Sequence, residues 1–303
     1  MNNKSFPDLE ETKKRIPQLF KIKIPELVTD SNPIEICKKW LGDYYKIFPE
    51  LPVRKKIFES KEFDAPLYRA SILREGFNEN LLFEYSYPPR DKAPLGRCNF
   101  PVYPVLYTSF DPIIALKETI TEDELPVTLY ISRWKVIPDD NIQIVLQEFM
   151  PENLPQNNPY FNKNNLIRSI DEFPPFLKTD SQKQAFLEIT KAFYNSFISS
   201  TDYIFSRILS HQSFFIYDGG ATDIILYPSV KDLSKINAAI SPNFADNQMQ
   251  IDRIYVLSVY LESIQITHFS EVINNKTNFV SRKNAPEKFT QILSEDFPDC
   301  SIT

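Results

Sequence analysis

Hydrophobic periodicity changes several times along this chain, and the order of the changes limits the folds open to it. Residues 1 to about 60 repeat apolar side chains at helical spacing, and alternation typical of strands begins at about residue 64. A pair of helical patterns follows, and strand patterns then return. Because helices and strands come in blocks, the sequence predicts an α+β fold and disfavours a doubly wound parallel sheet.

The strand predictions rest on short apolar runs, several of them with clear alternation. Val127, Leu129 and Ile131, for example, alternate with polar or half-polar neighbours. The predicted strands are Pro66–Ser71, Val102–Ser109, Val127–Trp134, Ile142–Leu146, Phe214–Tyr217, Asp223–Pro228, Arg253–Leu261 and Ile264–His268.

Helix signals are strongest near the N-terminus and in the middle of the chain. Asn32 followed by Pro33 is typical of a cap and a first helical turn. Later, a helix is predicted from a stripe of large apolar residues, and a second one after a break at Ser199–Thr201. The stripe consists of Phe186, Ile189, Phe193 and Phe197.

Two domains are expected from these patterns. Residues 1–60 are predicted to form an N-terminal helical extension, and residues 61–303 a larger domain. The larger domain contains a Pro- and Asn-rich stretch at about 150–180, which indicates a long surface insertion.

Charge and hydropathy exclude several classes of protein. The formal net charge of -6 disfavours a nucleic-acid partner, because such proteins usually carry a basic face. The N-terminus is charged and lacks the apolar core of a signal peptide, and no window approaches the roughly twenty apolar residues that span a bilayer. We therefore expect a soluble, cytoplasmic protein with no membrane partner.

Cysteine and histidine are too sparse for a metal centre. Cys37, Cys98 and Cys300 lie far apart, which indicates reduced thiols. With His211 and His268 as the two histidines, neither a zinc site nor a histidine-based triad is expected. The count of 5 Gly and the lack of a GxGxxG or Walker pattern mean that any nucleotide must be held without a glycine-rich loop.

The residues with the clearest chemical potential lie between Gly96 and Glu118. Asp111 and Pro112 predict a helix start, which places Glu118 about two turns into the helix. A carboxylate in a partly apolar cleft is one interpretation of Glu118, and an exposed helical glutamate is the other. Likewise, Tyr107 suits either a ligand platform or core packing, and Arg97 either a phosphate grip or an ordinary surface position.

Together these residues resemble the RES domain, a family named for its Arg, Glu and Ser. The chain has Gly-Arg-Cys-Asn at 96–99, Tyr107-Thr-Ser109, Ala115-x-x-Glu118 and the pair Pro228-Ser229. Tyr68 and Arg69 in a predicted opening strand also fit. The resemblance covers roughly residues 64–235, with departures at Cys98, at Tyr103 and in the 111-residue gap from Glu118 to Ser229.

The resemblance implies a fold like that of ADP-ribosyltransferases, with mixed or antiparallel sheets and flanking helices, and NAD as substrate. It implies four catalytic residues: Glu118 to steady the ribose cation, Arg97 to clamp the pyrophosphate, Tyr107 to stack on the nicotinamide end and Ser229 to orient it. Arg97, Tyr107, Ser229 and Arg69 would bind NAD. Some family members are toxins with an antitoxin partner.

Three functions remain open at this point. The first is cleavage of the nicotinamide–ribose bond of NAD, with water or phosphate as acceptor. The second is mono-ADP-ribosylation of a protein, which the sequence does not separate from the first because the same cation forms in both. The third is an NAD-binding or interaction module without turnover, which the departures from the family pattern favour.

Overall fold

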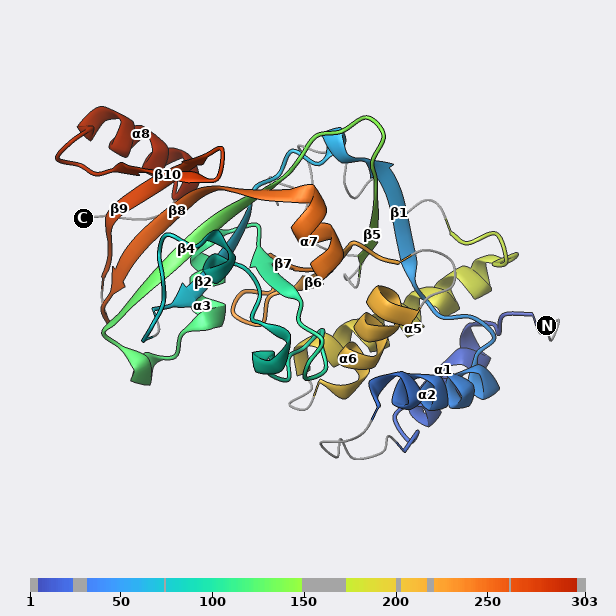
Figure 1. The fold of residues 1–303 in the computed structure, drawn as a ribbon. Helices are drawn as coiled ribbons and strands as arrows, with labels where there is room; N and C mark the ends of the chain where they lie inside the picture. Colours follow the sequence, from blue (N-terminus) through green and yellow to red (C-terminus); the bar gives the residue numbers. More distant parts are fainter. Residues whose placement is uncertain are drawn as a thin grey trace. The chain divides into compact units, whose positions relative to one another are not determined.

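The structure is a computed structural model of the chain, and it describes residues 5–23, 32–73, 75–148, 173–199, 203–216, 221–261 and 263–298 (Figure 1). It divides into two compact units, which are described separately. The first unit comprises Met1–Phe58, Arg90–Pro104 and Ile144–Pro228, and the second comprises Glu59–Pro89, Val105–Gln143 and Ser229–Thr303. The described residues contain helices and mostly antiparallel strands, so the predicted α+β class is confirmed.

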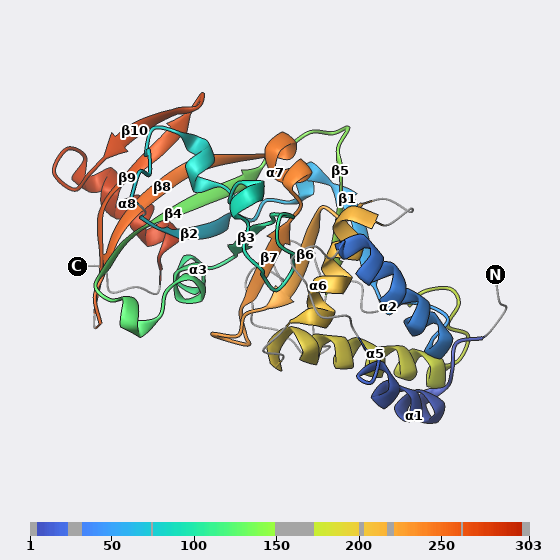
Figure 2. The same cartoon turned by 60° about the horizontal axis from the view of Figure 1, so that its bottom comes forward.

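The first unit is built mainly from helices around an aromatic core. Its elements are α1 (Leu9–Leu19), α2 (Pro33–Ile47), β1 (Arg54–Glu59), β5 (Gln143–Glu148), α5 (Asp180–Ser199), α6 (Ile204–His211) and β6 (Ile224–Pro228). Helix α5 packs against α1 and α6, and α2 packs against α6 (Figure 2). The rings of Trp40 and Tyr44 on α2 contact Phe193 on α5. The apolar stripe of α5 therefore faces the aromatic core of this unit.

The start of α2 is the one that the sequence predicts. Asn32 caps α2, with its side-chain oxygen accepting from the Ile34 N–H at 3.0 Å, and Pro33 lies in the first turn as predicted. The predicted helical character of residues 1–60 is wrong at Arg54–Glu59, which form strand β1 beside β5. Most of the Pro- and Asn-rich insertion, residues 149–172, lies outside the described residues.

A second correction concerns the strand predicted at Phe214–Tyr217. Residues Gln212–Ile216 instead form a π-helical turn that continues α6, and Tyr217 lies outside the described residues. The Ser213 hydroxyl donates to the Leu209 carbonyl at 2.9 Å, which ties the turn to the helix. An apolar run this short does not show whether it is helical or extended. Here it continues the helix that precedes it.

His211, the last residue of α6, is buried among aromatic rings. The rings of Phe100, Tyr103 and Phe215 lie 5.2, 4.7 and 4.9 Å from its ring centroid. Neither ring nitrogen has a hydrogen-bond partner among the described residues. Burial lowers the pKa of His211 from 6.5 to about 4, because no partner offsets the desolvation of the charged imidazole.

This environment predicts a loss of stability in mild acid. The unfolded chain takes up a proton on His211 near pH 6.5 and the folded chain near pH 4, so the free energy of unfolding falls as the pH drops between these values. In urea titrations we expect the wild type to lose about 2–3 kcal/mol more than His211→Leu between pH 7.5 and 4.5. Parallel pH profiles for the two proteins would contradict this account.

The second unit is built on a seven-stranded stretch of sheet. Its strands run in the order β7-β3-β2-β4-β8-β9-β10, and their neighbouring pairs are antiparallel. The strands are β2 (Leu67–Ile72), β3 (Leu106–Ser109), β4 (Val127–Val136), β7 (Ile236–Ile240), β8 (Met249–Val259), β9 (Ile264–Ile273) and β10 (Lys276–Val280). Its helices are α3 (Pro112–Thr119), α7 (Pro242–Gln248) and α8 (Pro286–Asp296).

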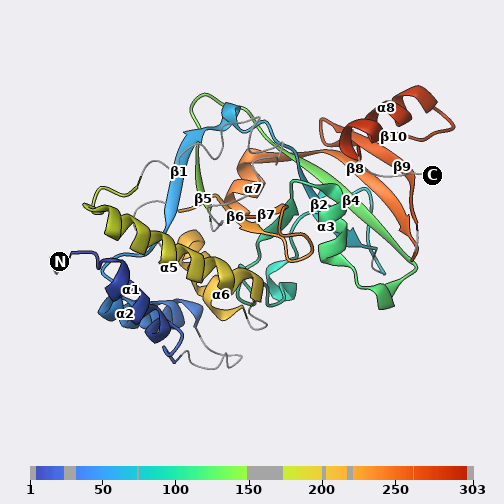
Figure 3. The same ribbon diagram turned by 180° about the vertical axis from the view of Figure 1, so that it is seen from behind.

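The two faces of this sheet carry different side chains. Ala70 on β2 and Leu129 and Ile131 on β4 form one buried cluster with Leu116 of α3 and residues of α8. We call this the helix face. Figure 3 labels these strands and helices in the ribbon. Because successive side chains of a strand point to opposite faces, Arg69, Ser132 and Trp134 lie on the other face. We call that the loop face, because Ser132 donates there to the carbonyl of Tyr85 in the loop before β3 at 3.2 Å.

The strand predictions hold in this unit with two kinds of difference. Strand β3 begins at Leu106 and not at Val102, because Val102 has a φ of 60° and Pro104 has no N–H for a ladder. Strands β7 and β10 and helices α7 and α8 were not predicted. Both helices begin with a proline, and Ser241 caps α7, so local start signals were present.

A buried cluster of charges joins α8 to the helix face. Asp296 accepts hydrogen bonds from Arg133 Nη1 at 2.7 Å, from Arg253 Nη1 at 2.9 Å and from the hydroxyls of Tyr68 and Tyr255. The Arg133 guanidinium also pairs with Asp252. Burial and the nearby Asp296 carboxylate raise the pKa of Tyr255 well above its usual range, so its hydroxyl stays a donor.

Candidate functional site

Glu118 lies near the end of α3, and the sequence fixes where that helix starts. Asp111 Oδ1 accepts from the N–H groups of Ile113 and Ile114 at 2.9 and 3.2 Å, as expected of an N-cap. Its second oxygen accepts from Lys235 Nζ at 2.8 Å. Ala115 and Leu116 pack the helix against the sheet. Glu118, two residues after Leu116, is half-buried.

Three donors converge on one oxygen of Glu118. Oε1 accepts from the Ser229 hydroxyl at 2.6 Å, from the Asn237 side-chain amide at 2.9 Å and from the Val230 N–H at 3.2 Å. Ser229 is 0% exposed and Asn237 3% exposed, so the carboxylate is held by fixed partners. The hydrogen bonds of Glu118 within the described residues all end on Oε1, and Oε2 accepts none there. We call Glu118 and its three donor residues, Ser229, Val230 and Asn237, the Glu118 cluster.

The hydrogen bonds of the Ser229 hydroxyl indicate its role. Its hydroxyl donates to Glu118, while its oxygen accepts from the Lys231 N–H at 3.0 Å. The resemblance to the RES domain implies that the Ser229 hydroxyl orients nicotinamide, but a hydroxyl has a single proton to donate. The geometry therefore supports a positioning role, in which Ser229 fixes the Glu118 carboxylate.

Tyr107 shares a sheet face with the Glu118 cluster. Strand β3 pairs Ser109 with both Tyr68 of β2 and Asn237 of β7. Directly paired residues point to the same face, and so do residues two apart on one strand, so Tyr107 and Asn237 lie on the helix face with α3. Tyr107 is half-buried there.

Arg69 has a different position. It is paired with Ser132 on β4 and lies on the loop face, opposite the face that α3 covers. Of the predicted site residues in the second unit, the fold thus groups Tyr107, Glu118 and Ser229 and directs Arg69 away from them.

Arg97 belongs to the first unit, where aromatic rings hold it. Its guanidinium carbon lies 4.8 Å from the ring centroid of Tyr203 and 5.6 Å from that of Tyr227. The Ser206 hydroxyl donates to the Arg97 carbonyl at 2.8 Å, and Arg207 Nε donates to the Gly96 carbonyl at 2.8 Å. The turn that carries Arg97 is therefore fixed from both sides, which suits a preorganised anion grip.

Cys98, beside Arg97, fills a core position. It is 0% exposed, and burial raises the pKa of its thiol to about 12. Such a thiol is protonated at neutral pH, so Cys98 packs without acting as a nucleophile.

Asn237 is a site residue that the sequence analysis missed. It bonds Glu118 through its amide group, and its Oδ1 is buried without a partner among the described residues. A buried acceptor left unpaired is costly unless a ligand satisfies it. The available signal was an asparagine within the apolar run Ile236–Ile240, where a polar side chain needs a partner.

The described residues contain neither a cluster of metal ligands nor a helix that could span a membrane. No group of three or more His, Cys, Asp or Glu side chains there could hold a metal ion. Among the helices of the described ranges, none combines the length and the apolar character needed to cross a bilayer.

Comparison with known proteins gives a limited result. No protein-family model matches the sequence, and no curated protein matches it. A solved structure that is similar in part is the crystal structure of the M. tuberculosis MbcT-MbcA toxin-antitoxin complex. The match has 14% identity and a TM-score of 0.36, and it covers 64% of this chain and 84% of that chain. A likeness of this extent establishes neither a family nor an activity, so the resemblance to the RES domain stays a prediction.

Proposed function

We propose that this chain cleaves the bond between nicotinamide and ribose in NAD, with water or phosphate as acceptor. The observation that carries the proposal is the Glu118 cluster, in which three donors fix one carboxylate oxygen and leave the other for a ligand. The donors come from residues 111 or more positions away in the chain. An exposed helical glutamate would not need such a set of partners.

The chemistry of the reaction suits these groups. As nicotinamide departs, positive charge grows on the ribose, and a fixed carboxylate stabilises that charge without having to reorganise. Glu118 Oε2 would accept a ribose hydroxyl and face the developing cation. Asn237 Oδ1 would accept a second donor from the substrate, such as a ribose hydroxyl or the carboxamide.

Two further residues complete the proposal. Tyr107, on the helix face, would lie against the nicotinamide end and restrict its motion. The resemblance to the RES domain assigns the pyrophosphate to Arg97 in the first unit, and a guanidinium held by aromatic rings suits an anionic group. No glycine-rich loop is needed if a side chain supplies the anion contact.

The test is to incubate the purified full chain with NAD and to separate the products by liquid chromatography. Free nicotinamide with ADP-ribose indicates water as acceptor, and ADP-ribose 1-phosphate in phosphate buffer indicates phosphate. If adenine-labelled NAD leaves its label on a protein, the reaction is transfer to a macromolecule and the choice of acceptor is wrong. NAD binding without nicotinamide release contradicts the proposal and indicates a module without turnover.

An antitoxin partner is a further prediction from the resemblance. Under the proposal, an inhibitory protein would act by covering the Glu118 cluster. Growth of cells that express the chain alone, with NAD measured in extracts, checks whether such an inhibitor is needed.

A further inference from the structure

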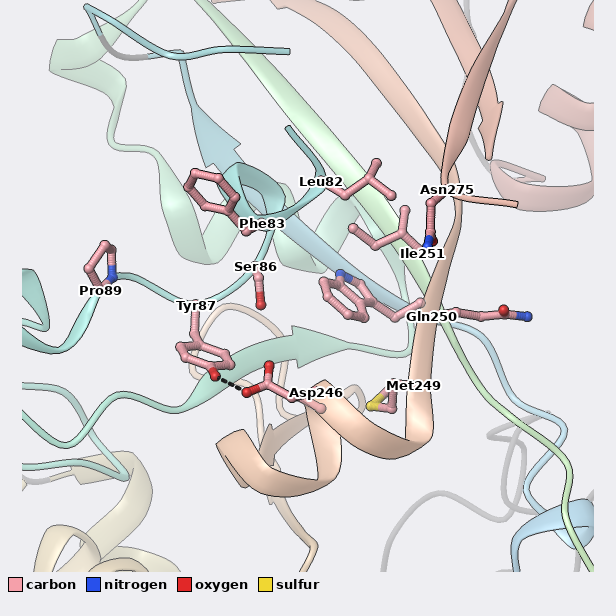
Figure 4. Close-up of a pocket in the computed structure, with 12 residues that line it drawn as sticks. Leu82, Phe83, Ser86, Tyr87, Pro89, Asp246, Met249, Gln250, Ile251 and Asn275 are labelled. Carbon is pink, nitrogen blue, oxygen red and sulfur yellow. Dashed lines mark hydrogen bonds between the residues drawn. The ribbon is translucent and has the colours of Figure 1, made fainter. Parts of the chain in front are cut away.

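The second unit holds an open cavity of about 370 Å³ on the loop face. Leu82 and Phe83 of the loop before β3 form one wall, and Met249 and Ile251 at the start of β8 form another (Figure 4). Phe83 is 62% exposed, which is unusual for so large an apolar side chain. The volume falls in the range of small-molecule sites.

The floor of the cavity is preformed. Trp134 lines it, and its indole N–H donates to the Ser132 hydroxyl at 2.9 Å, which fixes the ring. The loop that carries Phe83 is held in turn by Tyr85, whose ring packs edge-on against Tyr130 and whose hydroxyl donates to the Glu79 carbonyl. The aromatic lining is therefore ordered before a ligand binds, which avoids the entropy cost of ordering it on binding.

The polar part of the cavity is negative. Tyr87 donates to Asp246 Oδ2 at 2.6 Å, on the side opposite Leu82 in Figure 4. Burial and this hydrogen bond raise the pKa of Tyr87, so its hydroxyl remains a donor to the carboxylate. Of the side chains that line the cavity, Asp246 is the one charged group, and it has no cationic partner among the described residues.

The cavity is separate from the Glu118 cluster. Trp134 lies on the loop face of the sheet, whereas α3 and Asn237 lie on the helix face. Its negative charge also makes it unsuited to the pyrophosphate of NAD. The cavity is therefore a candidate site for a different kind of ligand.

We propose that this cavity binds a small organic ammonium ion with an apolar, preferably aromatic, substituent. The ammonium group would pair with Asp246, with the rings of Tyr87 and Phe83 adding attraction to the cation. The substituent would lie against Trp134, Met249 and Ile251, which line the cavity, and would cover part of the exposed Phe83 ring. The inference does not depend on the proposed cleavage of NAD.

Three probes with a shared phenyl body test the proposal on the full chain by calorimetry and ligand-observed NMR. They are 2-phenylethylammonium, the neutral 2-phenylethanol and the anionic 3-phenylpropanoate. We expect the cation to bind with a dissociation constant of about 1 mM or lower, about fivefold more tightly than the alcohol, and the anion to bind most weakly. Phe83→Ala should weaken the cation and the alcohol alike, by about tenfold.

Asp246→Asn tests the charge without removing the acceptor for Tyr87. We expect this variant to bind the cation and the alcohol equally, whereas Asp140→Asn, an exposed charge change in the same unit, should keep the preference. The proposal is overturned if none of the probes binds saturably, if the anion binds as well as the cation, or if Asp246→Asn keeps the fivefold preference. It is equally overturned if Phe83→Ala binds like the wild type.

Discussion

Replacing Glu118 by glutamine is expected to lower the rate of nicotinamide release by about 100- to 1,000-fold. Glutamine keeps an oxygen that can accept from Ser229, Asn237 and Val230, so the three hydrogen bonds at this position can persist. What the variant loses is the negative charge opposite the developing ribose cation. The measurement is the rate of nicotinamide release at saturating NAD, with the melting temperature as a check on folding.

Glu287→Gln is the matched control for this variant. Glu287 is an exposed glutamate in the first turn of α8, in the same unit, and its replacement should leave the rate unchanged. Ser229→Ala removes one of the three donors and should have a smaller effect than Glu118→Gln, because the charge remains. If Glu118→Gln retains the wild-type rate, charge stabilisation by this carboxylate is wrong.

Truncating Asp296 is expected to lower the free energy of unfolding by about 3–5 kcal/mol, the largest stability effect that we predict. The carboxylate is 5% exposed and is the shared acceptor of two arginines and two tyrosines. In Asp296→Ala, Arg253 keeps a 3.6 Å contact with Glu295, and the hydrogen bonds that the buried Tyr68 and Tyr255 hydroxyls donate to Asp296 are lost. Urea unfolding followed by circular dichroism measures the change.

The neighbouring Glu295 provides the control. It also lies near Arg253, but it is 47% exposed, so Glu295→Ala should cost less than about 1 kcal/mol. Both variants remove one negative charge near Arg253, so the difference between their losses in unfolding free energy measures the effect of burial. Equal losses for Asp296→Ala and Glu295→Ala would show that the buried cluster contributes nothing beyond a surface pair.

Where the sequence predicts well, a local cause is sufficient. Asn32 and Asp111 each have a side-chain oxygen that satisfies the first N–H groups of a helix, so both helix starts were predictable. The alternation of Val127, Leu129 and Ile131 likewise marks a strand whose faces differ. These features depend on residues close together in the chain.

The errors arise where the pattern of a segment's own residues does not decide its conformation. Arg54–Glu59 become a strand through the neighbouring β5, and Gln212–Ile216 extend a helix that precedes them. In the candidate site, neither periodicity nor spacing could show that Ser229 and Asn237 meet Glu118, since the contacts span 111 and 119 residues. The resemblance to the RES domain named Ser229, whereas Asn237 was found from the geometry.

A crystal structure of the Glu118→Gln variant with NAD is the most direct test of the central claim. Loss of the charge should slow cleavage enough to trap the intact dinucleotide. The account predicts the nicotinamide-side ribose within hydrogen-bond distance of residue 118, with Asn237 Oδ1 bonded to the same end of NAD. NAD bound elsewhere on the chain, with residues 118 and 237 not in contact with it, would contradict the account.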